Sequence, residues 1–461
     1  MRAWPALLVL AATLAVAPMP RAAAESATDL QALIDTAEPG AVLSLEAGRY
    51  EGGVVIDKPL TLRGIEWPVI DAGGEGTAIE IKATDVTIEG LVIRNTGDSL
   101  DRENAGVSVL EPRATIRNNR FENVLFGVFL RGADDSVVAD NVIGAKDLDV
   151  ARRGDGIRLW ESERTVVEGN QVDGGRDSVF WFSNGVVVRN NEVSNGRYGL
   201  HLMYSDDAVV EGNVLTANSV GAFLMYGRDT VLRNNVMAEN YGPSGYGVGL
   251  KDMDAVAAEG NRLIGNRVGL YLDNSPWSYD QHQYVRSNLF AYNDIGVLFL
   301  PSVKRNEFSG NAFIDNGEQV GVQGTGDFSG NAWSIDGVGN YWSDFAGYDA
   351  DGDGMGDVPY RLDDLYSTLT DRHPELAFFS ETPAAKAVDL AARMFPVLRP
   401  RPKVEDQHPL LNVPELPPIV TATSSTGPAL LAVSVLLLVV AAAIVALSSH
   451  RRRSPPRGAT P

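Results

Sequence analysis

The chain has 461 residues, a formal net charge of −21 and 44% hydrophobic residues. An acidic balance of this size argues against nucleic acid or anionic membrane surfaces as partners, and it suits cations or basic protein patches. Cysteine is absent, so disulfides and thiolate metal sites are excluded, and a soft-metal site would have to be built from Met and His.

The first 24 residues are typical of a signal peptide. Arg2 supplies the positive charge, Ala6–Ala17 forms an apolar stretch, and the small residues Ala22–Ala24 precede Glu25. The alternative, an N-terminal membrane anchor, is disfavoured because the apolar run is too short. We therefore expect an exported protein whose mature chain begins near residue 25.

A repeat with a period near 22 residues fills the middle of the chain. Related phrases such as TIRNNR, VVEGNV and VLRNNV carry Asn at a fixed point. These positions are Asn119, Asn141, Asn170, Asn191, Asn213, Asn235, Asn261, Asn288, Asn311 and Asn331. A repeat of this length with β-branched residues and Gly/Asn turns predicts an all-β fold, a right-handed parallel β-helix over residues 25–335.

The repeated Asn is expected at a corner of each coil, because Asn tolerates the left-handed conformation and its amide can hydrogen-bond from coil to coil. Three longer intervals of 29, 26 and 27 residues predict loops extruded from a turn. An all-β sandwich is the alternative, and the phased Asn phrases make it improbable.

Alternation along the strands predicts which side chains face outward. The residue two after each repeated Asn is apolar, and so are the first and third residues after the glycine of the next strand. Positions two and four after that glycine should then face outward. This places Met203, Met225 and Met253 in one outward stripe, with His201 beside Met203. Asp252 falls on an inward position, so we expect this strand to bulge or end early.

The stripe of His201, Met203, Met225 and Met253 is a candidate copper site. Thioether and imidazole groups are soft to borderline ligands that suit Cu(I). The alternative is an apolar stripe covered by another protein, with Tyr204, Tyr226 and Phe223 as the contact surface. The two interpretations are compatible, because a copper-handling surface must also dock its donor or acceptor.

An acidic segment, residues 336–378, follows the predicted solenoid. Its carboxylates Asp349, Asp351, Asp353 and Asp357 match positions 1, 3, 5 and 9 of a calcium loop. Tyr360 stands where the bidentate acid at position 12 belongs, and a later Asp could substitute. We expect Ca²⁺ to bind here and stiffen the segment; a solvated acidic turn is the alternative.

The C-terminal region predicts a linker and an anchor. Residues 379–428 carry nine prolines and no strand pattern, which indicates a semi-stiff linker. Residues 429–447 lack charge and are just long enough for one transmembrane helix. The Arg triplet at 451–453 places the basic tail, residues 448–461, in the cytoplasm. The alternative is a sorting tail that is removed after export.

No catalytic residue is predicted. Parallel β-helices often act on acidic polysaccharides through paired carboxylates or an Arg/Lys base. The pairs Asp134-Asp135, Asp206-Asp207 and Arg176-Asp177 fall where turns fall, which favours solvated turn residues.

Four phrases of the chain resemble the NosD family over roughly residues 28–365. They are RGDGIRLWES (153–162), RYGLHLMYSDD (197–207), VGLYLDNSPWSYD (268–280) and GNYWSDFAGYDADGDGMGDVPY (339–360). The resemblance implies a periplasmic, non-enzymatic β-helix protein that assists maturation of the copper sites of nitrous oxide reductase. It also implies an ABC transporter (an ATPase and a permease) and a copper chaperone as partners.

The chain departs from the family in one respect. The family is expected to be soluble in the periplasm, whereas this chain carries a predicted membrane anchor. The competing function, a polysaccharide-binding or lyase/epimerase-like surface protein, is suggested by the fold alone.

Overall fold

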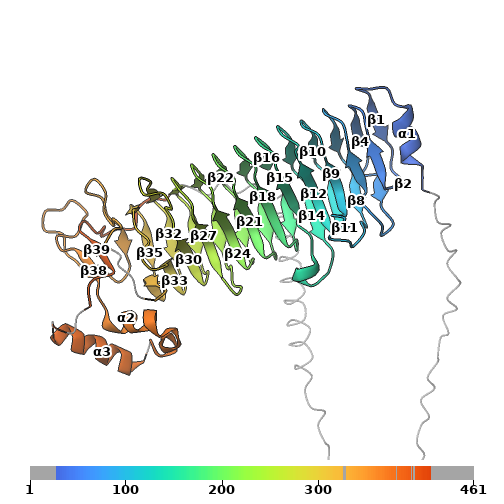
Figure 1. The fold of residues 1–461 in the computed structure, drawn as a ribbon. Helices are drawn as coiled ribbons and strands as arrows, with labels where there is room; N and C mark the ends of the chain where they lie inside the picture. Colours follow the sequence, from blue (N-terminus) through green and yellow to red (C-terminus); the bar gives the residue numbers. More distant parts are fainter. Residues whose placement is uncertain (1–26, 325–328, 381, 396, 398–399, 417–461) are drawn as a thin grey trace, which may run out of the picture.

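The structure, a computed structural model, describes residues 27–324, 329–380, 382–395, 397 and 400–416. These residues form an elongated right-handed parallel β-solenoid, which confirms the predicted fold class (Figure 1). Each coil contributes one strand to each of three parallel sheets, which have 12, 13 and 12 strands in the part of the chain described.

The first sheet consists of β1 (Val42–Leu45), β4 (Thr61–Gly64), β7 (Thr87–Glu89), β10 (Thr115–Arg117), β13 (Val137–Ala139), β16 (Val166–Glu168), β19 (Val187–Arg189), β22 (Val209–Glu211), β25 (Val231–Arg233), β28 (Ala257–Glu259), β31 (Gln283–Arg286) and β34 (Asn306–Ser309). The second sheet consists of β2 (Arg49–Glu51), β5 (Val69–Asp71), β8 (Val92–Arg94), β11 (Arg120–Val124), β14 (Val142–Ala145), β17 (Gln171–Asp173), β20 (Glu192–Ser194), β23 (Val214–Thr216), β26 (Val236–Ala238), β29 (Arg262–Ile264), β32 (Leu289–Ala291), β35 (Ala312–Ile314) and β37 (Tyr341–Trp342). The third sheet consists of β3 (Val54–Ile56), β6 (Ile79–Ile81), β9 (Ala105–Val109), β12 (Phe126–Arg131), β15 (Ile157–Trp160), β18 (Asp177–Trp181), β21 (Tyr198–Met203), β24 (Val220–Met225), β27 (Tyr246–Lys251), β30 (Val268–Asp273), β33 (Ile295–Phe299) and β36 (Glu318–Val322).

The core runs along the axis of the solenoid. The side chains two residues after each repeated Asn are all buried, as predicted, and they are Phe121, Ile143, Val172, Val193, Leu215, Met237, Leu263, Phe290, Phe313 and Trp333. Because like residues stack on successive coils, each coil can bury its apolar face only against its neighbours. The predicted extruded loops are confirmed between β14 and β15, β26 and β27, and β30 and β31, and the first contains a 3₁₀ turn, η1 (Val150–Arg152).

A ladder of buried asparagines joins the coils. In each step one Asn donates its backbone N–H and its amide Nδ2 to the Oδ1 of the next, as Asn191 does to Asn213 at 3.0 and 2.9 Å. The ladder continues from Asn311 to Asn340, so the assignment of Asn331 to it is wrong; Asn331 instead accepts from Asn306.

The left-handed residue of each corner is not the repeated Asn but the residue before it. Asn118, Asn190 and Asn234 have φ of 53°, 55° and 56°. The predicted conformation of the repeated Asn is therefore wrong, because its side chain points inward to bond along the ladder while its predecessor makes the turn. A second ladder escaped the sequence pattern. It comprises the buried Asn218, Asn240, Asn266 and Asn293 and ends at the partly buried Asn316.

A short helix covers the N-terminal end of the solenoid. Asp29 caps α1 (Leu30–Thr36) by accepting the N–H of Ala32 at 3.0 Å, and Leu30 and Ile34 are fully buried. The helix therefore shields the open end of the core, as solenoids require at their termini.

The C-terminal segment packs back onto the other end, where an extended linker was expected. Beyond β38 (Tyr360–Leu362) lie α2 (Leu365–Arg372), the 3₁₀ helix η2 (Pro374–Phe379) and α3 (Pro383–Met394), and then β39 (Val404–Asp406), which pairs antiparallel with β38 (Figure 1). The prolines did not prevent this, since Pro383 occupies the first turn of α3, where no N–H is needed. Asp406 is buried and accepts hydrogen bonds from Asn340 N and Trp342 Nε1 at 2.7 and 3.0 Å.

Three predicted segments lie outside the described residues. They are the signal peptide (1–24), the transmembrane helix (429–447) and the basic tail (448–461). Among the residues that the structure does describe, none of the helices has the length and apolar character needed to cross a membrane.

Candidate metal-handling site

The outer face of the third sheet brings Met203 and Met225 together. They end the neighbouring strands β21 and β24 and pair directly in register, and both side chains are half-buried. Neighbouring strands lie about 4.8 Å apart, so two flexible thioethers at this spacing can converge on one ion. His201 lies two residues before Met203 on the same face.

Met253 does not belong to this stripe, so its prediction is wrong. β27 ends at Lys251, which pairs with Met225, and Asp252 has a φ of 48°. Met253 is 1% exposed, and its sulfur accepts the N–H of Gly227 at 3.2 Å. The expectation that the strand ends early at Asp252 is thereby confirmed.

The error has a local cause. The phrase YGVGLK contains two glycines, and the stripe was counted from Gly249. The structural counterpart of Gly221 is Gly247, because the residues that follow them, Ala222 and Val248, pair in register. Counting four residues from Gly247 gives Lys251, whose ammonium bonds Asp273 at 2.7 Å.

His201 is buried in a box of aromatic rings. It is 6% exposed, with ring centroids of Trp181, Tyr198 and Phe223 at 5.3, 4.9 and 6.4 Å. Neither of its ring nitrogens has a hydrogen-bond partner, and Nδ1 lies 3.9 Å from Asp177 Oδ2. Burying an unpartnered polar atom costs about 1–3 kcal/mol, so this ring has lone-pair capacity that the protein leaves unused. This imidazole and the two thioethers are the soft donors that the face carries.

A charged cluster surrounds His201 on the adjoining coils. Asp177 accepts from Arg197 Nε at 2.9 Å and from the backbone N–H of Tyr198 at 3.2 Å. Burial raises the pKa of Asp177, but the adjacent His201 and Arg197 outweigh it and hold that pKa below its ordinary value. The interpretation of Asp177 as a solvated turn residue is wrong, since it is 3% exposed.

Asp155 is the second buried carboxylate of this cluster. Burial raises its pKa to about 6, although Arg176, whose Nε lies 3.2 Å from Oδ1, opposes the shift. Further buried polar atoms without a hydrogen-bond partner belong to the same cluster, and they are Asp155 Oδ2, Arg158 Nε, Ser178 Oγ and Trp181 Nε1. Sequence reasoning missed this cluster, although Arg158 and Asp177 were visible as charges within apolar phrases.

A stack of exposed and partly exposed rings borders the methionine pair. Phe182, Tyr204 and Tyr226 stack on successive coils with centroids 5.1 and 5.0 Å apart. Beside them is an open pocket of about 490 Å³ that Asp206, Asp254 and Trp277 also line. Tyr204 and Tyr226 directly follow Met203 and Met225, so a protein docked on the rings would cover the methionines.

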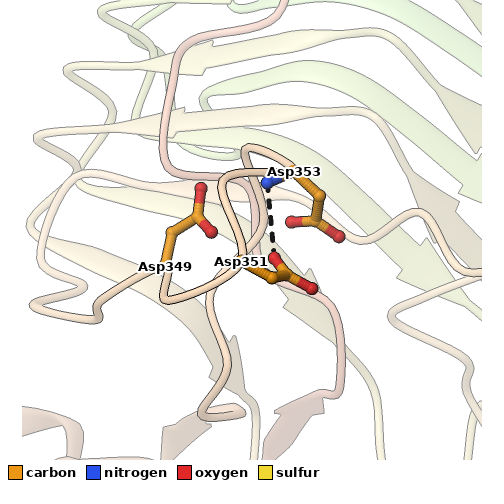
Figure 2. Close-up of side chains that lie close together, drawn as sticks. All are labelled: Asp349, Asp351 and Asp353. Atoms are coloured by element: carbon orange, nitrogen blue, oxygen red, sulfur yellow. Dashed lines mark hydrogen bonds between the residues drawn. The ribbon is translucent and has the colours of Figure 1, made fainter.

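The predicted calcium loop brings together three of its four carboxylates. Figure 2 shows Asp349, Asp351 and Asp353, which each offer an oxygen within 4.8 Å of the others. Asp357 instead accepts the N–H of Ala350 at 2.6 Å. Backbone N–H groups of Gly354 and Gly352 lower the pKa of Asp349. The N–H of Asp353 lowers the pKa of Asp351, but neighbouring carboxylates raise it by more.

Fold and site together define a parallel β-solenoid with a thioether pair and a buried imidazole on one outer face. Residues 143–347 match the family described as periplasmic copper-binding protein (NosD). A Pseudomonas aeruginosa protein named probable ABC transporter binding protein NosD is 33% identical over 392 residues, 81% of this chain and 89% of that protein. A protein of the same name from Stutzerimonas stutzeri is 31% identical over 386 residues, 80% of this chain and 86% of that protein. The chain therefore belongs to the NosD family.

A solved structure with a similar fold is the A-module of the mannuronan C-5 epimerase AlgE6 from Azotobacter vinelandii. The TM-score is 0.53 at 17% identity, covering 67% of this chain and 96% of that one. At this identity the likeness shows the fold and nothing of the chemistry.

Proposed function

We propose that this protein is an exported, non-enzymatic copper-handling factor that assists assembly of the copper sites of nitrous oxide reductase with an ABC transporter and a copper chaperone. The family description supports copper and the periplasm, and the names of the two relatives support the transporter. The observation that carries the proposal is the in-register pair Met203–Met225 beside the unpartnered nitrogens of His201.

The donor set suits transport better than storage. Two thioethers and one imidazole bind Cu(I) without adding negative charge, and they resist the oxidation that would consume thiols. The methionines remain half-exposed at the end of their strands, where a partner's ligands can reach the ion. Lys251, the next residue in the row, is neutralised by Asp273 and so does not repel a monovalent ion strongly.

Anaerobic titration of the full chain with Cu(I) against a competing chelator tests the proposal. The double substitution Met203→Leu/Met225→Leu should weaken Cu(I) binding at least roughly 10-fold, the low end for lost metal contacts. Met253→Leu is the matched control: it is a similar-sized change in the core and should leave the affinity unaltered. Equal Cu(I) affinity in the double variant and the wild type would exclude this face as the site.

One observation favours a second candidate function, a polysaccharide-active or polysaccharide-binding protein. The buried Asp155 and Asp177 have pKa values shifted in opposite directions, an arrangement that acid–base catalysis uses. Incubation with uronate polymers decides between the two functions: shortened or unsaturated products that disappear with Asp177→Asn would favour the enzyme. A chain that binds Cu(I) and leaves these polymers intact supports the first proposal.

A further inference from the structure

Trp181 borders both the imidazole and the first of the two methionines. It is the last residue of β18 and pairs in register with Met203, while its ring lies edge-on to His201 with centroids 5.3 Å apart and planes at 88°. Trp160 packs against it from the preceding coil at 5.7 Å, which limits the ring's freedom. The row along the outer face therefore reads Trp160, Trp181, Met203, Met225 and Lys251.

The carboxylates at the two ends of the row are already paired with cations. The carboxylate of Asp177 is engaged by Arg197, and that of Asp273 pairs with Lys251 at the end of the row. The donors that the methionine row and His201 offer are two thioethers and one imidazole, whereas hard and borderline divalent ions favour oxygen or additional nitrogen. An indole face attracts a cation within about 6 Å of its centroid and excludes water without adding charge.

We propose that the indole of Trp181 caps a monovalent copper ion held by His201, Met203 and Met225, and that this cap makes the site selective for Cu(I) over divalent ions. This inference rests on the proposed function. It adds the oxidation state of the bound copper and a residue, Trp181, that selects for it.

The test is anaerobic titration of the full chain with Cu(I), followed by chelator competition and by indole absorbance and fluorescence. Trp181→Phe keeps an aromatic ring with a weaker face, and it should lower Cu(I) affinity roughly 3- to 30-fold and remove the metal-induced indole change. Trp160→Phe is the matched control, one coil further from Met203, and it should preserve both. Zn²⁺ should bind weakly and respond to neither substitution.

Incorporation of 5-fluorotryptophan provides a measurement that does not depend on refolding of a variant. Fluorine weakens the ring's attraction for cations while keeping its shape, so affinity should fall, and the ¹⁹F signal missing in Trp181→Phe should shift on Cu(I) addition. Cu(I) binding with no indole response, unchanged in Trp181→Phe, would overturn the cap but leave the copper site standing. Absence of Cu(I) binding by the wild type would overturn both.

Discussion

Buried amides are the residues on which this fold depends most directly. An Asn at the ladder position accepts from a backbone and an amide donor of the preceding coil and donates to a strand carbonyl of that coil, all shielded from water. The side chain thus replaces hydrogen bonds that a turn would otherwise obtain from solvent.

Asn213→Ala should lower the free energy of unfolding by at least about 3 kcal/mol. The change leaves the N–H and Nδ2 of Asn191 and the carbonyl of Val188 without their partner, at about 1–3 kcal/mol each. Gln171→Ala, an amide removed from an exposed strand position, is the control and should change stability by less than about 0.5 kcal/mol. Urea denaturation measures both; equal effects would contradict the ladder's role.

Asp155 predicts a pH dependence of stability with an unusual sign. Its folded pKa of about 6 lies above the ordinary 3.8, so the folded state holds this proton more tightly than the unfolded state. The contribution of Asp155 to stability is therefore largest below about pH 4, and it is lost as the pH rises through 6, by at most about 3 kcal/mol.

Asp155→Asn removes this contribution. The free energy of unfolding of the variant, relative to that of the wild type, should increase between about pH 4.5 and 7.5, as measured by urea denaturation at both pH values. Asp57→Asn, at an exposed carboxylate, should show a constant difference from the wild type. A constant difference for Asp155→Asn as well would mean that its folded and unfolded pKa values are equal.

At the scale of elements, periodicity was the reliable signal. A side chain's face follows from parity within a strand, so the buried row from Phe121 to Trp333 and the outward positions of Met203 and Met225 could be predicted from sequence. The register between coils was predicted less reliably. Two glycines in β27 shifted the count by two residues, and Asn331 was taken for the ladder residue Asn340, which lies nine residues later.

The remaining features depend on contacts distant in sequence. Burial of His201 and Asp177 comes from aromatic and Arg side chains of other coils, which no local pattern encodes. The C-terminal helices were missed because proline content was taken as a linker signal, whereas Lys403 and Asp406 anchor this segment to the last coils.

Lys403→Met should detach the C-terminal helical segment from the solenoid. The buried ammonium contacts Glu318 of β36 and Asp371 of α2 at 2.8 and 2.7 Å, so its removal leaves the 8%-exposed side chain of Asp371 unpaired. Breaking a buried pair of this kind costs about 3–5 kcal/mol. Hydrogen exchange should rise in α2 and β39 while the central coils stay protected.

The matched control is Lys82→Met, which breaks a surface pair with Glu80 and should alter exchange little. Unchanged protection of α2 in Lys403→Met would show that apolar packing alone holds this segment.

The acidic loop predicts a calcium-dependent gain in stability. If Asp349, Asp351 and Asp353 take up Ca²⁺, saturating ion at about 100 times Kd should add about 2.7 kcal/mol to the free energy of unfolding of the coils it contacts. Thermal unfolding with Ca²⁺, with Mg²⁺ and in Asp349→Asn/Asp353→Asn measures this. A solvated turn would give identical melting curves in all three.

At the scale of the whole molecule, the solenoid separates two tasks along its length. The proposed copper face lies on the middle coils, whereas the C-terminal helices pack at the C-terminal end of the solenoid (Figure 1). The net charge of −21 favours partners that present basic patches, so association should weaken as salt screens the attraction.

The packed C-terminal segment also shortens the predicted tether. The described part of this segment ends at residue 416, so only residues 417–428 separate it from the predicted membrane helix. These residues span at most about 45 Å. We therefore expect the end of the solenoid to stay near the membrane, where tethering replaces free encounter with a high effective concentration of membrane partners.

Cell fractionation tests this tether. The full chain, tagged at its C-terminus, should appear in the membrane fraction with an externally protease-accessible solenoid, because residues 429–447 lack charge and precede an Arg triplet. A chain that ends at Leu416 keeps every described element and should move to the soluble periplasmic fraction with the same thermal midpoint. Full-length protein found soluble and without its C-terminal tag would show instead that the apolar run is a sorting tail removed after export.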